Sequence, residues 1–457
     1  MVSPHLAASS RHFLSLQCSS LAPFSLGQER LVAVGAFEQD AEVSVGRGGV
    51  GNKRRDWMIF DVSELFFSTS TSTKKQNEKP KKQQHRLAII HLRAEGGNNS
   101  NAVKAVELAA WVPPAAVTCS AAAQIPSTSS NSSTTTLLAA GCADGSLCRL
   151  RVSFPRSSPG ATIAETKLNE DDFEAADLLP WRKRLHAGAV TSVAVSSSSD
   201  SSSSAVVASS GSDGSIVLTP VDSSSSDSSR VVVPARPAAS VSALAWAGPE
   251  TLAACGTASP VELFDARSRS QSPSGRPVAR AVASSSSASS DASLLCVHPT
   301  RPNLAATGGR RGIALWDLRF LSKGAVASLS NETSSSSSST SLSFSFSFSP
   351  LLKGGVTGLA FDPLPSAGLS DNQTPRLLFS TGDGAVGSAR MGSSGGGVGG
   401  SDATFSTSSD ASLLFREAGA SALALAVEQP SSLSDSSRDI FVSTDQECLV
   451  YLQRPLI

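Results

Sequence analysis

The sequence LCVHPTRPNLAATGGRRGIALWDLRF, at residues 295–320, contains two short apolar runs on either side of a glycine-rich turn. The first run begins after Asn303 and ends at Thr307, and the second begins after Gly312 and ends at Trp316-Asp317. Two such runs across a tight Gly turn predict an antiparallel β-hairpin. One hairpin cannot bury both of its faces by itself, so this unit predicts further units stacked beside it.

The rest of the chain contains six more units with two or more β-rich runs each. The dipeptide Trp316-Asp317 is typical of a blade of a WD40 β-propeller, a repeat of about 40 to 45 residues. The seven units lie at about residues 12–67, 101–153, 185–222, 239–267, 291–320, 353–391 and 418–454. Since seven is an ordinary number of blades, we predict one all-β, seven-bladed WD40 propeller over residues 12–455.

Polar residues mark the predicted turns of these units. The hairpin turns of four units contain an aspartate: Asp144, Asp213, Asp383 and Asp445. In the third unit, His186 precedes the inner strand, and in WD40 repeats such a His, the turn Asp and a strand Ser or Thr form hydrogen bonds with one another. A Ser-His-Asp set is also typical of a catalytic triad. Buried polar groups must be paired in any fold, so we interpret this set as structural.

An aromatic residue followed by Asp-x-Arg ends two neighbouring units. The fourth unit ends with Phe264, Asp265 and Arg267, and the fifth ends with Trp316, Asp317 and Arg319. This repetition supports the division of the chain into blades.

The excess length of the units falls in segments rich in Ser, Thr, Pro or Gly, which have too few apolar residues to order themselves. We expect long, disordered loop insertions at about residues 68–85, 120–134, 155–180, 196–204, 222–229, 268–290, 322–350, 392–412 and 429–437. The Phe-Ser alternation at 342–348 leaves two alternatives open, the outer strand of a blade or a sticky segment within an insertion. The lysines near residue 80 are interpreted as a solvated loop, with a nuclear-localisation or phosphate-binding patch as the alternative: Lys74, Lys75, Lys79, Lys81 and Lys82.

Composition and motifs exclude several classes of function. With 38 basic and 38 acidic residues, the chain has no global attraction to nucleic acid or to an anionic membrane. No apolar window reaches the roughly 18 residues of a membrane-spanning helix. No phosphate-binding loop, zinc-protease motif, Gly-x-Ser-x-Gly elbow or Cys/His cluster is present. We therefore expect no enzyme activity, no cofactor or metal, no small-molecule substrate, no direct contact with nucleic acid and no membrane insertion.

The seven cysteines are scattered and form no Cys-x-x-Cys pair, which indicates reduced thiols in the cytosol or nucleus. Cys142 and Cys148 flank one predicted turn, so this pair is expected to lie close together, without a disulfide or a metal between them.

The first 26 residues contain Arg11 but no acidic residue, a composition similar to an organelle transit peptide. We prefer the interpretation that residues 13–18 already form a strand of the first blade. The last unit ends on its third strand near Arg454, so we expect the N-terminal segment to supply the missing strand and close the ring.

The order of these features resembles the small WD40-propeller nucleoporin of the Y-shaped, outer-ring subcomplex of the nuclear pore. The resemblance covers residues 12–67 and 101–455 and is strongest at 186–319 and at the C-terminus. It is carried by His186-Ala-Gly-Ala-Val190 after an acidic insertion, by both aromatic-Asp-x-Arg endings, by VHPTRPN…ATGG…LWDLR and by the final Arg454-Pro455. Arg310 and Arg311 depart from the pattern, since they stand where the turn Asp is usual.

The resemblance implies a non-catalytic scaffold located at the nuclear pore complex in the nuclear envelope. Its partners would be other protein subunits of the Y complex, and its role would be to support mRNA export and nucleocytoplasmic protein transport. The alternative is another WD40 adaptor, such as a substrate receptor of a ubiquitin ligase or a subunit of a chromatin complex. Trp316, Asp317 and Arg319 match the WDxR motif that such receptors often carry.

Overall fold

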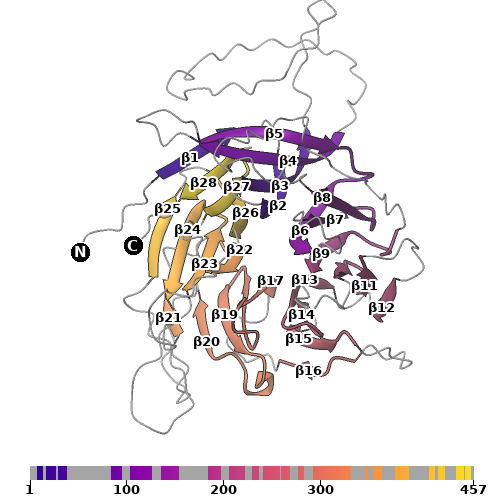
Figure 1. Cartoon of the computed structure of the whole chain (residues 1–457). Helices are drawn as coiled ribbons and strands as arrows, with labels where there is room; N and C mark the ends of the chain where they lie inside the picture. The colour runs from indigo at the N-terminus through magenta and orange to yellow at the C-terminus, as the bar shows by residue number, and fades with distance from the viewer. Residues whose placement is uncertain are drawn as a thin grey trace, which may run out of the picture.

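The computed structural model describes residues 8–13, 17–26, 29–38, 84–94, 103–125, 135–153, 184–196, 205–221, 229–235, 240–257, 259–267, 276–281, 292–330, 345–347, 354–362, 376–390, 411–416, 420–427, 439–446 and 448–453. Within these residues the chain forms seven β-sheets and one short 3₁₀ helix, η5 (Leu321–Lys323). The sheets are arranged as blades around a common centre (Figure 1). The predicted seven-bladed β-propeller is confirmed.

The blades are numbered in chain order, and the strands of each are given from the centre of the ring outward. Blade 1 contains β2 (Gln17–Leu26), β3 (Glu29–Glu38), β4 (Gln84–Ala94) and β5 (Val103–Trp111), and blade 2 contains β6 (Val117–Ile125), β7 (Thr135–Cys142) and β8 (Leu147–Ser153). Blade 3 contains β9 (Val190–Val195), β10 (Val206–Gly211), β11 (Ile216–Pro220) and β12 (Arg230–Val233), and blade 4 contains β13 (Val241–Trp246), β14 (Thr251–Gly256), β15 (Ser259–Asp265) and β16 (Ala279–Arg280). Blade 5 contains β17 (Ala292–Val297), β18 (Leu304–Gly309), β19 (Gly312–Asp317), β20 (Ala327–Ser330) and β21 (Ser345–Ser347), and blade 6 contains β22 (Val356–Phe361), β23 (Arg376–Thr381), β24 (Ala385–Arg390) and β25 (Ala411–Arg416). Blade 7 contains β26 (Ala422–Val427), β27 (Asp439–Thr444), β28 (Cys448–Gln453) and β1 (Ala8–Phe13).

The seven inner strands form the wall around the centre of the ring. Each contacts the inner strand of the next blade, and β26 of blade 7 contacts β2 of blade 1, so the ring is closed. We call the face on which the inner strands begin the upper face. The opposite, lower face carries the ends of the inner strands and of the third strands, such as Asp265 and Asp317.

One apolar cluster fills each of the seven interfaces between neighbouring blades. Strand β7 shows how one sequence serves two clusters. Leu137 and Ala139 pack against blade 3, whereas Leu138 and Ala140 pack against blade 1. Because side chains alternate along a strand and both faces of the blade are covered, the middle strands are continuous apolar runs.

A β-bulge interrupts each inner strand near its start, and the bulged residue carries a hydroxyl in six of the seven blades. The bulged residues are Ser19, Thr118, Thr191, Ser242, Ser293, Thr357 and Leu423. The first three hydroxyls each lie 2.5 Å from a carbonyl oxygen of the next blade, those of Val117, Val190 and Val241. The bulges thereby connect blades 1 to 4 through hydrogen bonds near the centre of the ring.

The boundary predicted between blades 1 and 2 was wrong. Strand β5 (Val103–Trp111), which we assigned to the second blade, pairs with β4 as the outer strand of blade 1. The second blade begins at β6 (Val117–Ile125), part of which we assigned to an insertion, because its Ala and Ser residues give a weak apolar pattern. The β-rich run at 57–67 that we placed in blade 1 lies outside the described residues.

Several outer strands lie in segments that we predicted to be disordered insertions. These are β16, β20, β21 and the start of β25. An outer strand is short and covered only in part, so it needs few apolar residues. The Phe-Ser alternation left open an outer strand or a sticky segment of an insertion. Residues 345–347 form the outer strand β21, which pairs in parallel with β20. The other predicted insertions lie mostly outside the described residues.

The N-terminal strand closes the ring, as predicted. β1 (Ala8–Phe13) pairs antiparallel with β28 (Cys448–Gln453) and completes blade 7. We assigned residues 13–18 to one strand of the first blade, but they belong to two blades. Phe13 ends β1 of blade 7, and Gln17 begins β2 of blade 1.

Removal of residues 1–13 should lower the thermal unfolding midpoint by at least about 5 °C, because it exposes the outer edge of β28. Circular dichroism during heating measures this midpoint. Removal of residues 1–6 leaves β1 intact and is the matched control. Equal midpoints for the two truncations would contradict a stabilising role of β1.

Candidate functional site

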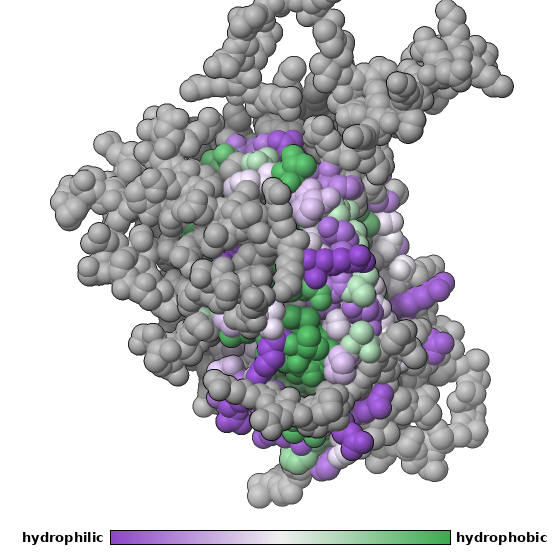
Figure 2. All heavy atoms as spheres, turned by 90° about the vertical axis from the view of Figure 1, so that its right-hand side faces the viewer, coloured by the Kyte–Doolittle hydropathy of each residue, from purple (hydrophilic) through white to green (hydrophobic). Residues whose placement is uncertain are grey.

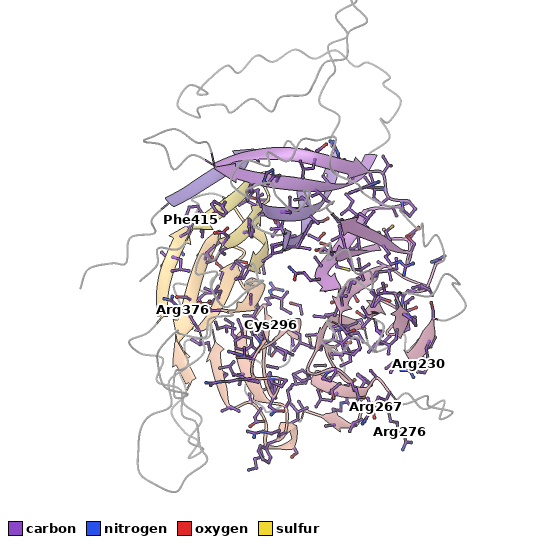
Figure 3. All side chains as sticks on the ribbon, in the orientation of Figure 1. Arg230, Arg267, Arg276, Cys296, Arg376 and Phe415 are labelled. Carbon is purple, nitrogen blue, oxygen red and sulfur yellow. The ribbon has the colours of Figure 1, made fainter. Side chains whose placement is uncertain are left out.

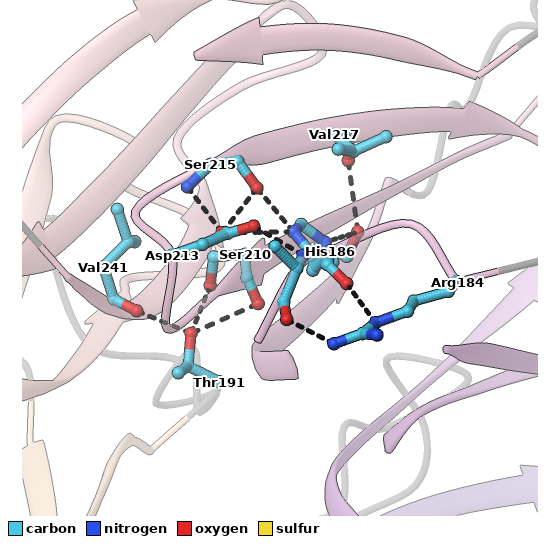
Figure 4. Close-up of polar contacts among 10 residues, drawn as sticks. Arg184, His186, Thr191, Ser210, Asp213, Ser215, Val217 and Val241 are labelled. Carbon is cyan, nitrogen blue, oxygen red and sulfur yellow. Dashed lines mark hydrogen bonds and ion pairs between the residues drawn. The ribbon is translucent and has the colours of Figure 1, made fainter. Parts of the chain in front are cut away.

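A buried polar cluster around His186 joins the segment before β9 to the turn between β10 and β11 (Figure 4). His186 Nδ1 is 2.6 Å from Ser215 Oγ, and Nε2 is 2.9 Å from Ser209 Oγ. Asp213 Oδ1 accepts hydrogen bonds from the backbone N–H and the hydroxyl of Ser215, and Oδ2 accepts one from the N–H of Ala187. The structure thus brings His186 and Asp213 together, with Nδ1 and Oδ1 3.7 Å apart.

The environment of this cluster favours a structural role over catalysis. Burial lowers the pKa of His186, and the nearby Asp213 opposes that shift only in part. Partial burial raises the pKa of Asp213, but the hydrogen bonds from Ser215 and Ala187 outweigh it and hold the pKa below its usual value. Ser209 is fully buried and Ser215 is 6% exposed, so neither hydroxyl can reach a substrate.

The other turn aspartates lie in separate blades and form no common site. Asp144 accepts hydrogen bonds from the N–H and the hydroxyl of Ser146, within its own turn. Asp383 pairs with Arg416 at 2.8 Å. Asp445 Oδ1 accepts the N–H of Ser421 at 2.8 Å. On the upper face of the ring, Asp144 therefore fixes its own turn, whereas Asp383 and Asp445 connect their turns to another segment of the same blade.

The aromatic residues of the two Asp-x-Arg units are buried. Trp316 is fully buried and donates its Nε1–H to Thr307 Oγ1 at 2.8 Å. Phe264, which is 2% exposed, packs in the cluster between blades 3 and 4. Both residues hold their blades together from inside and present nothing to a partner.

The Asp and Arg of the same units lie at the surface of the lower face. Asp317 accepts hydrogen bonds from the Nε, the Nη2 and the backbone N–H of Arg319, at 3.0, 2.6 and 3.0 Å. Asp265 accepts the backbone N–H of Arg267 at 2.8 Å, and the Arg267 guanidinium also pairs with Glu250 at 2.9 Å. The guanidinium hydrogen bonds hold the pKa of Asp317 below its usual value.

These two pairs form the candidate functional site. The Arg319 and Arg267 side chains are 61% and 65% exposed, yet each is held in place by a carboxylate on its own strand. They lie on neighbouring blades, at the ends of β15 and β19. A fixed, exposed guanidinium is well suited to contact a partner protein.

His298 lies in the same region of the fold, but it is buried between blades 5 and 6. Its Nδ1 accepts the backbone N–H groups of Thr300 and Arg301 at 3.2 and 3.1 Å, and its ring is 5.1 Å from that of Phe361. Burial lowers the pKa of His298 to about 4, with the Arg301 cation acting in the same direction and Asp362 against it. His298 is therefore neutral at pH 7 and fixes the turn after β17.

The polar contacts between blades were not predicted from the sequence. The hydroxyls of Ser19, Thr118 and Thr191 were missed, although a Ser or Thr after the first apolar residue of an inner strand is a usable signal. The buried Arg149 was also missed, and its guanidinium donates to the carbonyl of Val221 in blade 3. The sequence around Arg149 does not indicate which carbonyl accepts its hydrogen bond.

We next consider where the described residues could hold a metal or a small molecule or cross a membrane. Cys142 Sγ and Cys148 Sγ are 3.8 Å apart, close together as expected. No group of three or more His, Cys, Asp or Glu among the described residues is placed to hold a metal. A hollow between blades 3 and 4, beside Ser240 and Phe264, holds about 20 Å³, room for about one water. In the part of the chain that is described, no helix is long and apolar enough to cross a bilayer.

Comparison with known proteins supports the fold and nothing finer. No family model and no curated protein sequence matches the chain. The structure is similar to that of Sqt1 from Chaetomium thermophilum, with 13% identity, a TM-score of 0.52, and coverage of 96% of this chain and 97% of that one. The same protein bound to the N-terminus of the ribosomal protein L10 gives 14% identity, a TM-score of 0.49 and coverage of 96% and 100%. Sqt1 from Saccharomyces cerevisiae gives 10% identity, a TM-score of 0.49, and coverage of 97% of this chain and 98% of that one.

None of these three structures is a nucleoporin, so they add no support to the outer-ring assignment. At such low identity, the likeness with a TM-score of 0.52 shows only the propeller fold.

Replacement of Asp213 by Asn should destabilise the protein more than replacement of Asp144 by Asn. Asp213 accepts hydrogen bonds from two segments of chain, whereas Asp144 accepts hydrogen bonds within its own exposed turn. We expect a loss of about 1–3 kcal/mol for Asp213→Asn and under about 1 kcal/mol for Asp144→Asn. Urea unfolding of both variants measures the difference, and equal losses would show that the His186 cluster adds nothing.

Acid should weaken the fold through His298. Because its pKa falls from 6.5 to about 4 on folding, the unfolded chain binds a proton between these pH values that the folded chain does not. The free energy of unfolding should therefore decrease as the pH falls from 6.5 to 4, by up to about 3 kcal/mol from this residue. Urea unfolding at several pH values measures the slope, and His298→Asn should flatten it. An unchanged slope in the variant would refute the assignment.

Proposed function

We propose that the protein is a non-catalytic WD40 adaptor that binds other proteins through the lower face of blades 4 and 5. The observation that carries this proposal is the pair of exposed Arg side chains on neighbouring blades, Arg267 and Arg319, each fixed by an aspartate of its own blade. The His and Ser residues of the triad-like set, His186, Ser209 and Ser215, are buried inside blade 3.

Rigidity supports this role. A closed ring holds surface residues of adjacent blades at fixed separations, so a partner that contacts both arginines meets a preformed surface. Arg319 makes two guanidinium hydrogen bonds to Asp317, which limits the side-chain freedom that would be lost on binding.

Within the adaptor role, we propose a substrate receptor of a ubiquitin ligase or a subunit of a chromatin complex. Trp316, Asp317 and Arg319 match the WDxR motif of such receptors. The buried Trp and the exposed, carboxylate-held Arg form an arrangement in which the motif's Arg is available to a partner.

A second candidate is a scaffold subunit of the outer ring of the nuclear pore complex, located at the nuclear envelope and supporting mRNA export and protein transport. Its support is the order of sequence features from His186 to Arg319 and the Arg454-Pro455 ending. The partners in that case are other subunits of the Y complex.

Affinity purification followed by mass spectrometry distinguishes the candidates. The tagged full chain should recover ligase or chromatin subunits if the adaptor assignment holds, or outer-ring subunits if the scaffold assignment holds. Arg319→Ala should reduce the recovered ligase or chromatin subunits at least about fivefold without unfolding the protein, because it removes one exposed contact. Arg416→Ala, an exposed Arg on blade 6, is the matched control. Full recovery of those subunits by Arg319→Ala would contradict the proposed contact surface.

A further inference from the structure

Arg230 connects blade 3 to the candidate functional site on blade 4. It is the first residue of β12, the outer strand of blade 3. Its guanidinium donates a hydrogen bond from Nη2 to the carbonyl oxygen of Ala266, and Nη1 lies 3.5 Å from the carbonyl oxygen of Arg267. Figure 3 shows Arg230 and Arg267 as neighbours on adjacent blades. A cation of one blade therefore contacts the backbone of the exposed arginine of the next.

The register of β12 turns the Arg230 side chain toward blade 4. Arg230 lies opposite Leu218 of β11, which packs between blades 3 and 4, and opposite residues of an antiparallel pair share one face of the sheet. The next residue, Val231, lies opposite Val217 on the other face and is 59% exposed. On the side of the ring that carries β8 and β12, apolar atoms gather between hydrophilic ones (Figure 2). Strand pairing within blade 3 therefore fixes the direction in which Arg230 reaches.

In blade 5, the turn that carries Arg319 is anchored by its own chain. The N–H of Leu318 donates to the carbonyl oxygen of Asn303 at 2.8 Å. Leu318 and Leu321, which are 6% and 2% exposed, pack in the cluster between blades 4 and 5, whereas Phe320 between them is 48% exposed. Buried apolar side chains on both sides of Arg319 thus fix its backbone.

In blade 4, the corresponding turn has an anchor from another blade. The N–H of Ala266 donates to the carbonyl oxygen of Glu250 at 2.7 Å, which corresponds to the Leu318 contact of blade 5. The carbonyl oxygens of Ala266 and Arg267 face the guanidinium of Arg230. Hydrogen bonds from a charged donor are stronger than those between neutral groups. Arg230 therefore gives the Arg267 turn a support that comes from blade 3.

The Arg267 side chain is held more weakly than that of Arg319. Arg267 Nε is 3.4 Å from Asp265 Oδ1, whereas Arg319 is 3.0 and 2.6 Å from the two oxygens of Asp317. Glu250, the other partner of Arg267, is itself 49% exposed. Exposed ion pairs restrain a side chain only weakly, so the position of the Arg267 guanidinium depends on its backbone.

We propose that Arg230 is a positioning residue of the lower face, which fixes the backbone at Ala266 and Arg267 so that Arg267 meets a partner protein in a preformed position. Arg230 itself does not contact the partner and acts through Arg267. This inference rests on the proposed adaptor function, and it extends the candidate site from blades 4 and 5 to blade 3.

Hydrogen exchange of the full chain, followed by mass spectrometry, tests the positioning directly. Arg230→Ala should speed the exchange of the Ala266 and Arg267 amides at least about threefold, because it releases the turn locally. The amides of Leu318 and Arg319, in the matching turn of blade 5, should exchange as in the wild type. Arg230→Lys keeps a charged donor and should lie closer to the wild type than Arg230→Ala does.

Arg416→Ala is the matched control, because it removes an exposed, carboxylate-paired Arg from blade 6. It should leave exchange at Ala266 and Arg267 unchanged. The positioning assignment is overturned if Arg230→Ala exchanges at these two amides as the wild type does. Equally faster exchange at Leu318 and Arg319 would also overturn it, since that result shows a general loss of stability.

Affinity purification with tagged variants tests the link to binding. Arg267→Ala should lower the recovery of partner proteins, and Arg230→Ala should lower it by no more than Arg267→Ala does. Adding Arg230→Ala to Arg267→Ala should cause no further loss, since residues that act through one contact are not additive. A further loss in the double variant would show that Arg230 contacts the partner itself and would overturn the proposal.

The two measurements separate this inference from the proposed function. Full recovery of partners by Arg267→Ala would refute the proposed contact at blade 4, and with it any role of Arg230 in binding. Unchanged exchange in Arg230→Ala, together with reduced recovery by Arg267→Ala, would refute only the positioning and leave the adaptor function intact.

Discussion

Burial of both faces of every blade is the constraint on which the structure depends. Neighbouring side chains of one strand, such as Leu137 and Leu138, belong to the apolar clusters of two different interfaces. No blade can cover its own faces, so each requires the two beside it, and the ring must close. Closure comes from contact between β26 and β2 and from the pairing of β1 with β28.

The same constraint separates stability from recognition. Trp316 and the His186 cluster are buried inside the blades, where Trp316 packs in the core and the polar atoms of His186 are hydrogen-bonded. Residues on the lower face, such as Arg319 and Phe320, are not needed by the core and can be selected for a partner. Position relative to the ring therefore explains why one repeat motif contributes a buried Trp and an exposed Arg.

The sequence was sufficient to predict the fold because the middle strands carry strong signals. Trp316-Asp317 and turns such as that at Asp213 are local features of chemistry and spacing. Outer strands were missed because β16 has only two residues, and its pairing with β15 depends on contacts far along the chain. The blade 1 boundary failed because the strands β3 and β4 are separated by a long segment, which local patterns cannot bridge.

The candidate site was predictable in part. Asp317 and Arg319 were found from a repeated motif, and the Asp213–His186 contact followed from the repeat. The exposure of Phe320 was not predictable, because a Phe in a loop is as often buried, and its exposure depends on how Leu318 and Leu321 anchor η5.

The pairing of β1 with β28 has a consequence for biosynthesis. Phe13 leaves the ribosome about 435 residues before its partner Cys448, which is roughly 20–90 s of translation. During that interval the earliest strand waits without its partner and the first blade has a bare flank. The nascent chain is then an open arc that exposes apolar surface, so we expect chaperones to shield it until β28 has been synthesised.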